Sequence, residues 1–169
     1  MKITYYGGQT AGVVGLLTLL ASKSQVVTVI PEDEGVRAIA EVFNIPIKEK
    51  NLLNTKECIS EMKEKSDVFF CCHGRKILSE AFVSSIPCIN IHPCLYSYKG
   101  AKPIKRLIED NNPKASVAAH YMVAEVDAGK TIVEYFKTIE EITTKTESQV
   151  YNELYPLYTK VILKTLQSL

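Results

Sequence analysis

The sequence has no tryptophan, no internal repeat and no low-complexity tract, and it has little excess charge of either sign. Without repeats, linkers or low-complexity segments, we expect one ordered globular domain over residues 1–169. With 20 basic and 19 acidic side chains, the formal net charge is only +1. A chain with this balance has no general attraction to nucleic acid or to an anionic membrane, and we expect neither as a partner.

The sequence also lacks a long hydrophobic run, a signal peptide and a disulfide framework. Its longest apolar stretch, at residues 11–21, is far shorter than the roughly 20 residues that span a bilayer. The opening residues MKITYY are too short and too polar for a signal peptide. The five cysteines are an odd number without regular spacing, so we expect reduced, buried thiols and a cytoplasmic protein.

Strand-like and helix-like segments alternate along the first half of the chain. Expected strands lie at residues 2–6, 25–30, 45–47, 67–72 and 88–92, and expected helices at 13–22, 32–43, 55–65 and 80–84. Asn54 is the expected cap of the third helix, because Glu57 stands three residues further on. This alternation predicts an α/β fold with an open, mainly parallel sheet flanked by helices.

The pattern changes after Pro93. We expect a helix at residues 102–109 and two strands, at 116–123 and 130–137, joined through the segment VAEVDAG. A last helix begins after Thr146, which forms a capping box with Gln149. Pro156 lies inside this helix and predicts a kink there.

Asn90 and His92 are two residues apart on an expected strand, so their side chains share one face of the sheet. Pro93 follows at once and places both at the carboxyl end of the strand. In open α/β sheets this edge is where ligands bind. From the residues alone, a hydrogen-bonded structural pair and a functional pair are both open interpretations.

Three other features carry a weaker signal. Asp127 precedes Ala-Gly, which is typical of a turn, and His120 on a strand is more often structural than catalytic. The glycine turn at residues 7–12 favours an anion through its N–H groups, but it matches neither the dinucleotide nor the Walker A pattern. Cys71, Cys72 and His73 alternate between the two faces of a strand, and we expect no metal site.

Three stretches together resemble the folate-dependent formyltransferases, whose active-site strand carries Asn-x-His followed by a Lys/Arg-Gly step. They are SIPCINIHPCLYSYKGAKPI at residues 85–104, AHYMVAEVDAGKTI at 119–132 and DVFFCCHGRKILSEAF at 67–82. The likeness extends over nearly the whole chain. It implies a Rossmann-like formyltransferase fold and transfer of a formyl group from the co-substrate 10-formyltetrahydrofolate to an amine.

The resemblance also implies roles for individual residues. Asn90 and a protonated His92 would flank the formyl carbonyl and stabilise the oxyanion that amine attack creates, while Asp127 would pair with His92 and accept a proton. The residues expected to hold the folate through their backbone are Arg75, Lys76, Ile77 and Leu78 on one side, and Val123, Ala124, Glu125 and Val126 on the other. The residues expected on the acceptor side are Gly8, Gln9, Thr10, Ala11 and His120. Arg75 or Lys76 is expected to meet the glutamate tail of the folate.

The acceptor stays open at this stage. The VDAG segment resembles glycinamide ribonucleotide formyltransferases, and KGAKPI resembles methionyl-tRNA formyltransferases, but the tRNA-binding C-terminal domain of the latter is not expected here. Sugar N-formyltransferases share the same core. We expect a small acceptor bearing a phosphate, such as a glycinamide-ribonucleotide-like molecule or a nucleotide-linked amino sugar. A hydrolase that releases formate, a folate-binding module without turnover, an unrelated nucleotide-binding protein and a homodimer all remain open.

Overall fold

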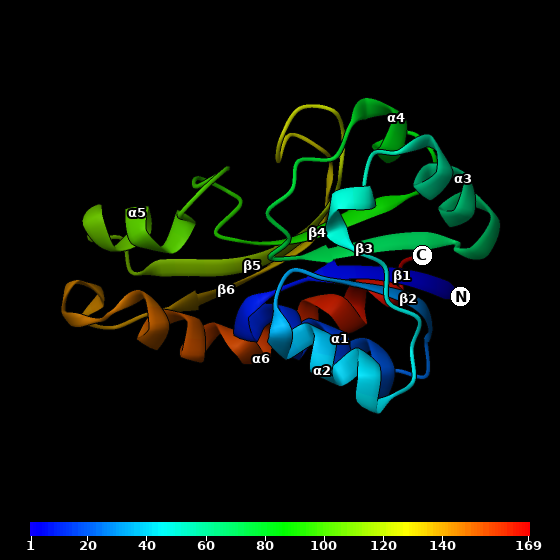
Figure 1. Cartoon of the computed structure of the whole chain (residues 1–169). Coiled ribbons are helices and arrows are strands. Elements are labelled where there is room, and N and C mark those ends of the chain that lie inside the picture. The colour runs from blue at the N-terminus through cyan, green and yellow to red at the C-terminus, as the bar shows by residue number, and fades with distance from the viewer.

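A six-stranded mixed sheet forms the centre of the computed structural model, which describes residues 1–169 (Figure 1). The strands lie in the order β2-β1-β3-β4-β5-β6. The first four are parallel, and β5 and β6 run antiparallel to their neighbours. Their bounds are β1 (Lys2–Gly7), β2 (Gln25–Pro31), β3 (Val68–Cys72), β4 (Cys88–Pro93), β5 (Lys114–Tyr121) and β6 (Thr131–Thr138). The expected α/β fold with a mainly parallel sheet is confirmed.

Helices cover both faces of this sheet (Figure 1). One face carries α1 (Gln9–Ala21), α2 (Glu34–Val42) and α6 (Glu147–Leu166). The other carries α3 (Lys56–Lys65) and the short α4 (Glu80–Val83). The remaining elements are α5 (Pro103–Glu109) and two 3₁₀ turns, η1 (Lys50–Leu52) and η2 (Ile142–Thr144). No helix combines the length and the apolar character that crossing a bilayer requires.

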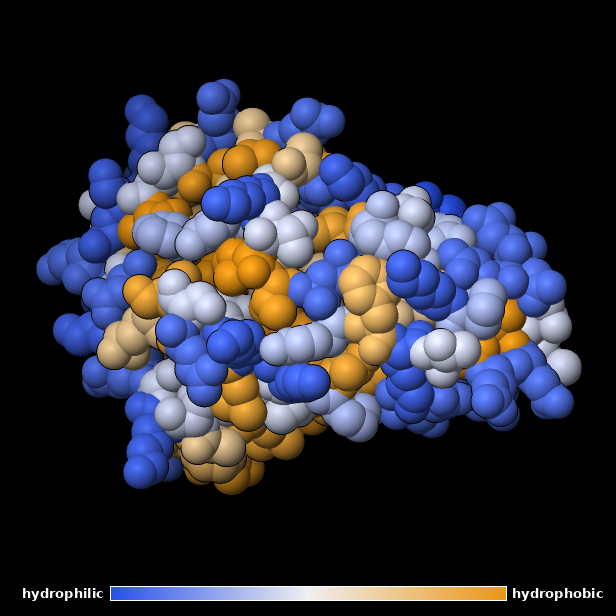
Figure 2. Space-filling view, turned by 180° about the vertical axis from the view of Figure 1, so that it is seen from behind, coloured by the Kyte–Doolittle hydropathy of each residue, from blue (hydrophilic) through white to orange (hydrophobic).

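The alternation of side chains along the strands builds one apolar core on each face. Tyr5 belongs to a cluster of 27 buried residues under α1, α2 and α6, and Tyr6 to a cluster of 10 under α3 and α4. In the same way β3 sends Phe70 to the larger cluster and Phe69 to the smaller one. On the face shown in Figure 2, apolar surface lies near the middle and is interrupted and surrounded by hydrophilic residues.

Three local expectations were wrong. The helix α1 begins at Gln9 rather than after Gly12, so most of the expected glycine turn is helical. The cap of α3 is Thr55, whose hydroxyl accepts from the Cys58 N–H, while Asn54 stands outside the helix with φ +74°. Residues 45–47 form no strand, only an isolated bridge between Val29 and Ile47. The expected capping box at Thr146 and Gln149 is confirmed.

The pairing of β4 with β5 places the first polar side chains of the site. The two strands run antiparallel, and Asn90 lies directly opposite His120 in their register. His92 stands two residues further along β4, on the same face as Asn90. The segment after β5 leads into the loop that carries Asp127, at residues 122–130. Residues distant in sequence therefore meet at one edge of the sheet.

Candidate active site

A cleft of about 730 Å³ opens at the carboxyl ends of β1, β3 and β4. Its wall includes Asn90, His92 and Asp127, the three expected catalytic residues, together with His120. Another pocket, lined partly by Thr4 and Lys48, holds only about 10 Å³ and lies away from these residues. The large cleft is therefore the candidate active site.

Asp127 is the residue on which the polar side chains converge. Its Oδ2 atom lies 3.0 Å from Nε2 of His92 and accepts a 2.8 Å hydrogen bond from the backbone N–H of Gly100. Its Oδ1 atom lies 3.4 Å from both Nδ2 of Asn90 and Nε2 of His120. The carboxylate thus joins β4, β5 and the loop after β4, and its backbone is held at φ +55°. An Asp tolerates this left-handed conformation better than most residues.

The electrostatics of the site keep this carboxyl ionised. Burial acts to raise the pKa of Asp127, whose side chain is 8% exposed. Contacts with the imidazoles of His120 and His92 and the hydrogen bond from the Gly100 N–H outweigh that effect and hold its pKa well below the ordinary 3.8. Asp127 is therefore a permanent acceptor for the groups around it at physiological pH.

The hydrogen bonds of the two histidines define their tautomers. Nδ1 of His120 donates to the carbonyl of Tyr121 at 2.9 Å, which leaves Nε2 to accept from Nδ2 of Asn90 at 3.2 Å. Nε2 of His92 faces two acceptors, Asp127 and the Gly100 carbonyl at 3.2 Å, so it carries a hydrogen. Nδ1 of His92 is buried without a partner. A protonated ring, as the resemblance implies, would have a second N–H at that atom, and its protonation stays a prediction.

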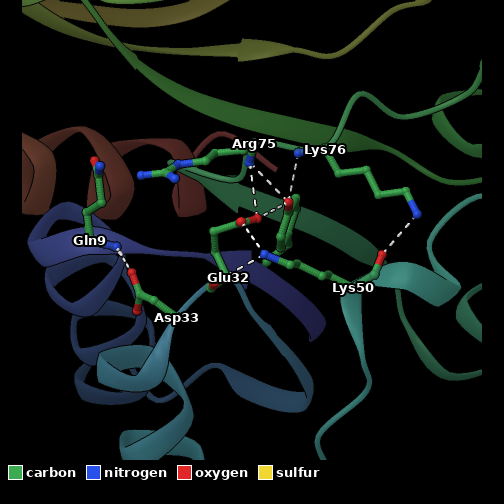
Figure 3. Close-up of polar contacts among 7 residues, drawn as sticks. Gln9, Glu32, Asp33, Lys50, Arg75 and Lys76 are labelled. Atoms are coloured by element: carbon green, nitrogen blue, oxygen red, sulfur yellow. Dashed lines mark hydrogen bonds and ion pairs between the residues drawn. The ribbon is translucent and has the colours of Figure 1, made fainter.

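Seven of the eight residues expected to hold the folate line the cleft. Arg75, Lys76, Ile77 and Leu78 line it, as do Val123, Ala124 and Val126, whereas Glu125 does not. Nζ of Lys76 donates to the carbonyls of Lys50 and Asn51, at 3.1 and 3.0 Å. The guanidinium of Arg75 has no hydrogen bond or ion pair and extends away from Lys50 in Figure 3. Arg75, not Lys76, is therefore the free cation for an anionic group.

The expected acceptor-side residues are only partly in the cleft. Gln9 and His120 line it, while Gly8, Thr10 and Ala11 do not. The N–H of Gln9, the first residue of α1, donates to Oδ2 of Asp33 at 2.5 Å (Figure 3). Asp33 also caps α2 through the Val36 N–H. A protein carboxylate thus stands at the helix terminus where the glycine turn was expected to bind an anion.

His73 is a cleft residue that the sequence did not single out for this chemistry. It follows β3 at φ +59°, and its ring contacts the Gln9 side-chain oxygen at 2.9 Å and the Tyr158 hydroxyl at 2.7 Å. Burial, with the nearby His92 and Arg75, lowers the pKa of His73 from its ordinary 6.5 to about 4. The ring is therefore neutral near pH 7. Its only signal in the sequence was its place after two strand cysteines.

Glu147 and Tyr151 were also missed. They lie one turn apart on α6, and both line the cleft. The ring of Tyr151 packs edge-to-face against His73, with 5.4 Å between centroids. The sequence predicted α6 but not which of its faces would reach the site. The structure contains no group of three or more side chains arranged to bind a metal ion.

Comparison with known proteins identifies the family. The formyl transferase family profile matches residues 7–166, nearly the whole chain. The chain belongs to the formyl transferase family. The methionyl-tRNA formyltransferase of Thermotoga maritima is 31% identical over 138 residues, which cover 79% of this chain and 44% of that protein. The chain thus spans less than half the length of this relative.

Solved structures with low sequence identity share the fold. Phosphoribosylglycinamide formyltransferase from Bacillus halodurans superposes with a TM-score of 0.83 at 19% identity, over 99% of this chain and 96% of that one. A formyltetrahydrofolate deformylase from Pseudomonas putida KT2440 gives 0.75 at 17% identity, over 95% and 62%. At these identities the likeness is one of fold, and it is shared by transferases and a deformylase.

Proposed function

We propose that this protein transfers a formyl group from 10-formyltetrahydrofolate to a primary amine of a small acceptor. The observation that carries the proposal is the convergence of Asn90, His92 and Asp127 in the large cleft, with Asp127 3.0 Å from His92. The family membership and the residues on the folate side of the cleft support the same donor.

In this proposal the acceptor nitrogen attacks the formyl carbon and forms a new C–N bond. The carbonyl oxygen becomes an oxyanion, which the Asn90 amide stabilises by exchanging its longer, 3.4 Å contact to Asp127 for the substrate. Asp127, directly or through water, accepts the proton that the amine loses. The bond from carbon to N10 then breaks, and N10 takes this proton from Asp127, directly or through water, as tetrahydrofolate leaves. His92, hydrogen-bonded to Asp127, donates to the developing charge.

The chemical class of the acceptor is a separate part of the proposal. A phosphate-bearing amine, as expected from the sequence, would need donors other than the N-terminus of α1, since Asp33 already accepts the Gln9 N–H there and repels an anion. The cleft instead presents Gln9, Glu147, Tyr151 and the cations Lys102 and Arg75. We therefore propose a small polar amine that is not anchored by a phosphate at α1. Methionyl-tRNA, the substrate in the name of the Thermotoga maritima relative, is a further candidate acceptor to be tested.

One alternative has a specific observation behind it. The fold is shared with a formyltetrahydrofolate deformylase, and the same trio could direct water instead of an amine at the formyl carbon. A folate-binding module without turnover is less consistent with a complete Asn90, His92 and Asp127 set. The transferase, the hydrolase and the binding module differ in whether turnover occurs and whether it requires an amine.

The test follows formate and tetrahydrofolate after incubation with 10-formyltetrahydrofolate alone, then with a panel of amines. The panel pairs each phosphorylated amine with its unphosphorylated form and includes nucleotide-linked amino sugars and methionyl-tRNA. Turnover that depends on an amine supports the transferase. Rapid formate release without any amine would identify the hydrolase, and binding without turnover under every condition would identify the module.

A further inference from the structure

The segment at residues 73–78, between β3 and α4, carries no backbone-to-backbone hydrogen bond. Five of its six residues, His73 to Ile77, are at least partly exposed, and all six line the large cleft. A segment without such bonds opens easily unless side chains from elsewhere satisfy its polar groups. Its conformation must therefore be held by its neighbours.

Tyr6 supplies the first of these contacts. This fully buried residue of β1 accepts hydrogen bonds at its hydroxyl from the backbone N–H groups of Arg75, at 3.0 Å, and Lys76, at 2.9 Å. The same hydroxyl donates its one hydrogen to Oε2 of Glu32 at 2.5 Å. One donor and two lone pairs are all that a phenol has, so its hydrogen-bonding capacity is fully used.

Glu32 fixes the Tyr6 hydroxyl in turn. Its side chain is 8% exposed, and its Oε1 atom pairs with Nζ of Lys50 at 2.5 Å. The side chain of Lys76 returns to the carbonyl of Lys50. The contacts therefore form a closed ring that joins β1, the end of β2, η1 and the segment at 73–78.

Packing reinforces the same arrangement. A Cβ atom added to Gly74 would lie 2.2 Å from the Tyr6 ring, so the backbone of Gly74 rests directly on that ring. At the other end of the segment, Nδ2 of Asn54 donates to the carbonyl of Ile77 at 3.0 Å, and its Oδ1 accepts from the Ser79 N–H at 2.8 Å. This is the residue that the sequence suggested as a helix cap.

We propose that Tyr6 and Asn54 are positioning residues that hold the segment at 73–78 in the conformation that binds the folate donor. Neither residue lines the cleft, so both act through the backbone of Arg75, Lys76 and Ile77. The inference rests on the proposed function in one respect, namely that the molecule meeting this wall of the cleft is a folate.

The first experiment compares Tyr6→Phe with the matched control Tyr5→Phe. Tyr5 is the preceding residue, equally buried, and its hydroxyl donates to the Gly12 carbonyl at 2.6 Å on the opposite face of the sheet. Both substitutions remove one buried hydroxyl. Only Tyr6→Phe is expected to raise KM for 10-formyltetrahydrofolate, by about tenfold, with kcat changed less than about twofold.

A second measurement does not depend on folate. Amide hydrogen exchange at Arg75 and Lys76 is expected to accelerate at least about tenfold in Tyr6→Phe and to stay unchanged in Tyr5→Phe. If wild type neither binds nor uses folate while the exchange rates change as expected, the proposed function fails and the positioning contact stands. Unchanged KM for the donor in an active Tyr6→Phe protein would overturn the positioning role.

Asn54→Asp keeps the proposal testable if Tyr6→Phe does not fold. The aspartate tolerates φ +74° and keeps an acceptor for the Ser79 N–H, but it loses the donor to Ile77. We expect a rise in donor KM of about three- to tenfold with kcat retained. Wild-type KM in this variant, together with unchanged exchange at residues 75–78, would overturn the proposal.

Discussion

Oδ2 of Asp127 lies 3.0 Å from Nε2 of His92 and receives the Gly100 N–H at 2.8 Å. This one oxygen connects a strand residue, a loop residue and the segment after β4. The arrangement fixes which ring nitrogen of His92 carries the hydrogen and keeps a carboxylate beside the place where an amine would lose its proton.

Asp127→Asn is expected to lower turnover at least about 100-fold while donor affinity changes less than about threefold. The carboxylate accepts from Asn90, His92 and the Gly100 N–H, whereas an amide has only one acceptor oxygen and places an NH₂ group against the other donors. Steady-state kinetics and equilibrium folate binding check both values. Glu140→Gln, an exposed carboxylate outside the cleft, is the control and should keep wild-type rates.

His92→Ala is expected to lower kcat about 100- to 10,000-fold with little change in KM for the donor. In the proposed mechanism the ring donates to charge that is present only in the transition state, so its removal should affect chemistry rather than binding. Single-turnover measurements with enzyme in excess isolate this step from product release. Wild-type single-turnover rates would contradict the role given to His92.

Phosphorylation of the acceptor is expected to change kcat/KM by less than about fivefold for a given amine, because Asp33 occupies the Gln9 N–H. The comparison uses paired phosphorylated and unphosphorylated amines at fixed ionic strength. A preference of about 100-fold for the phosphorylated forms would mean that cations such as Lys102 or Arg75 hold the phosphate instead, and the proposed acceptor class would be wrong.

His73 should make the protein less stable in mild acid. In the folded state its pKa is lowered to about 4, while in the unfolded chain it is near 6.5. Between these values the unfolded state binds more protons, so the contribution of His73 is complete above pH 6.5 and is lost as pH falls towards 4.

His73→Asn removes this titration and suits the left-handed backbone at that position. Between pH 7 and pH 4.5, the variant is expected to lose roughly 2 kcal/mol less unfolding free energy than wild type. Urea unfolding at several pH values gives the comparison. Parallel losses in both proteins would show that His73 is not buried in its neutral form.

The overall architecture could be read from local patterns. Apolar strands such as β3, buried on both sides, alternate with amphipathic helices. That alternation indicates a parallel sheet without any knowledge of tertiary contacts. Asn90 and His92 were also visible, because their shared face follows from strand geometry alone. The resemblance of the three quoted stretches identified the family, which the comparison confirmed.

Several site features could not be read in this way. Asp127 has the local signature of a turn residue, and it becomes part of the site only because β5 pairs antiparallel with β4. Asp33 reaches Gln9 because the end of β2 lies beside the end of β1. Asn54 was read as a helix cap since its sequence neighbours suggested one, but its amide contacts Ile77 instead.

The sequence by itself determined the alternating elements, the shared face of Asn90 and His92, and the family. These depend on residue periodicity and on short motifs, which act within one element. The tertiary structure decided that Asp127 accepts from His92, that Asp33 occupies the terminus of α1, and that Tyr6 holds the segment at 73–78. Each of these is a contact between distant elements, and its geometry exists only once the sheet brings those elements together.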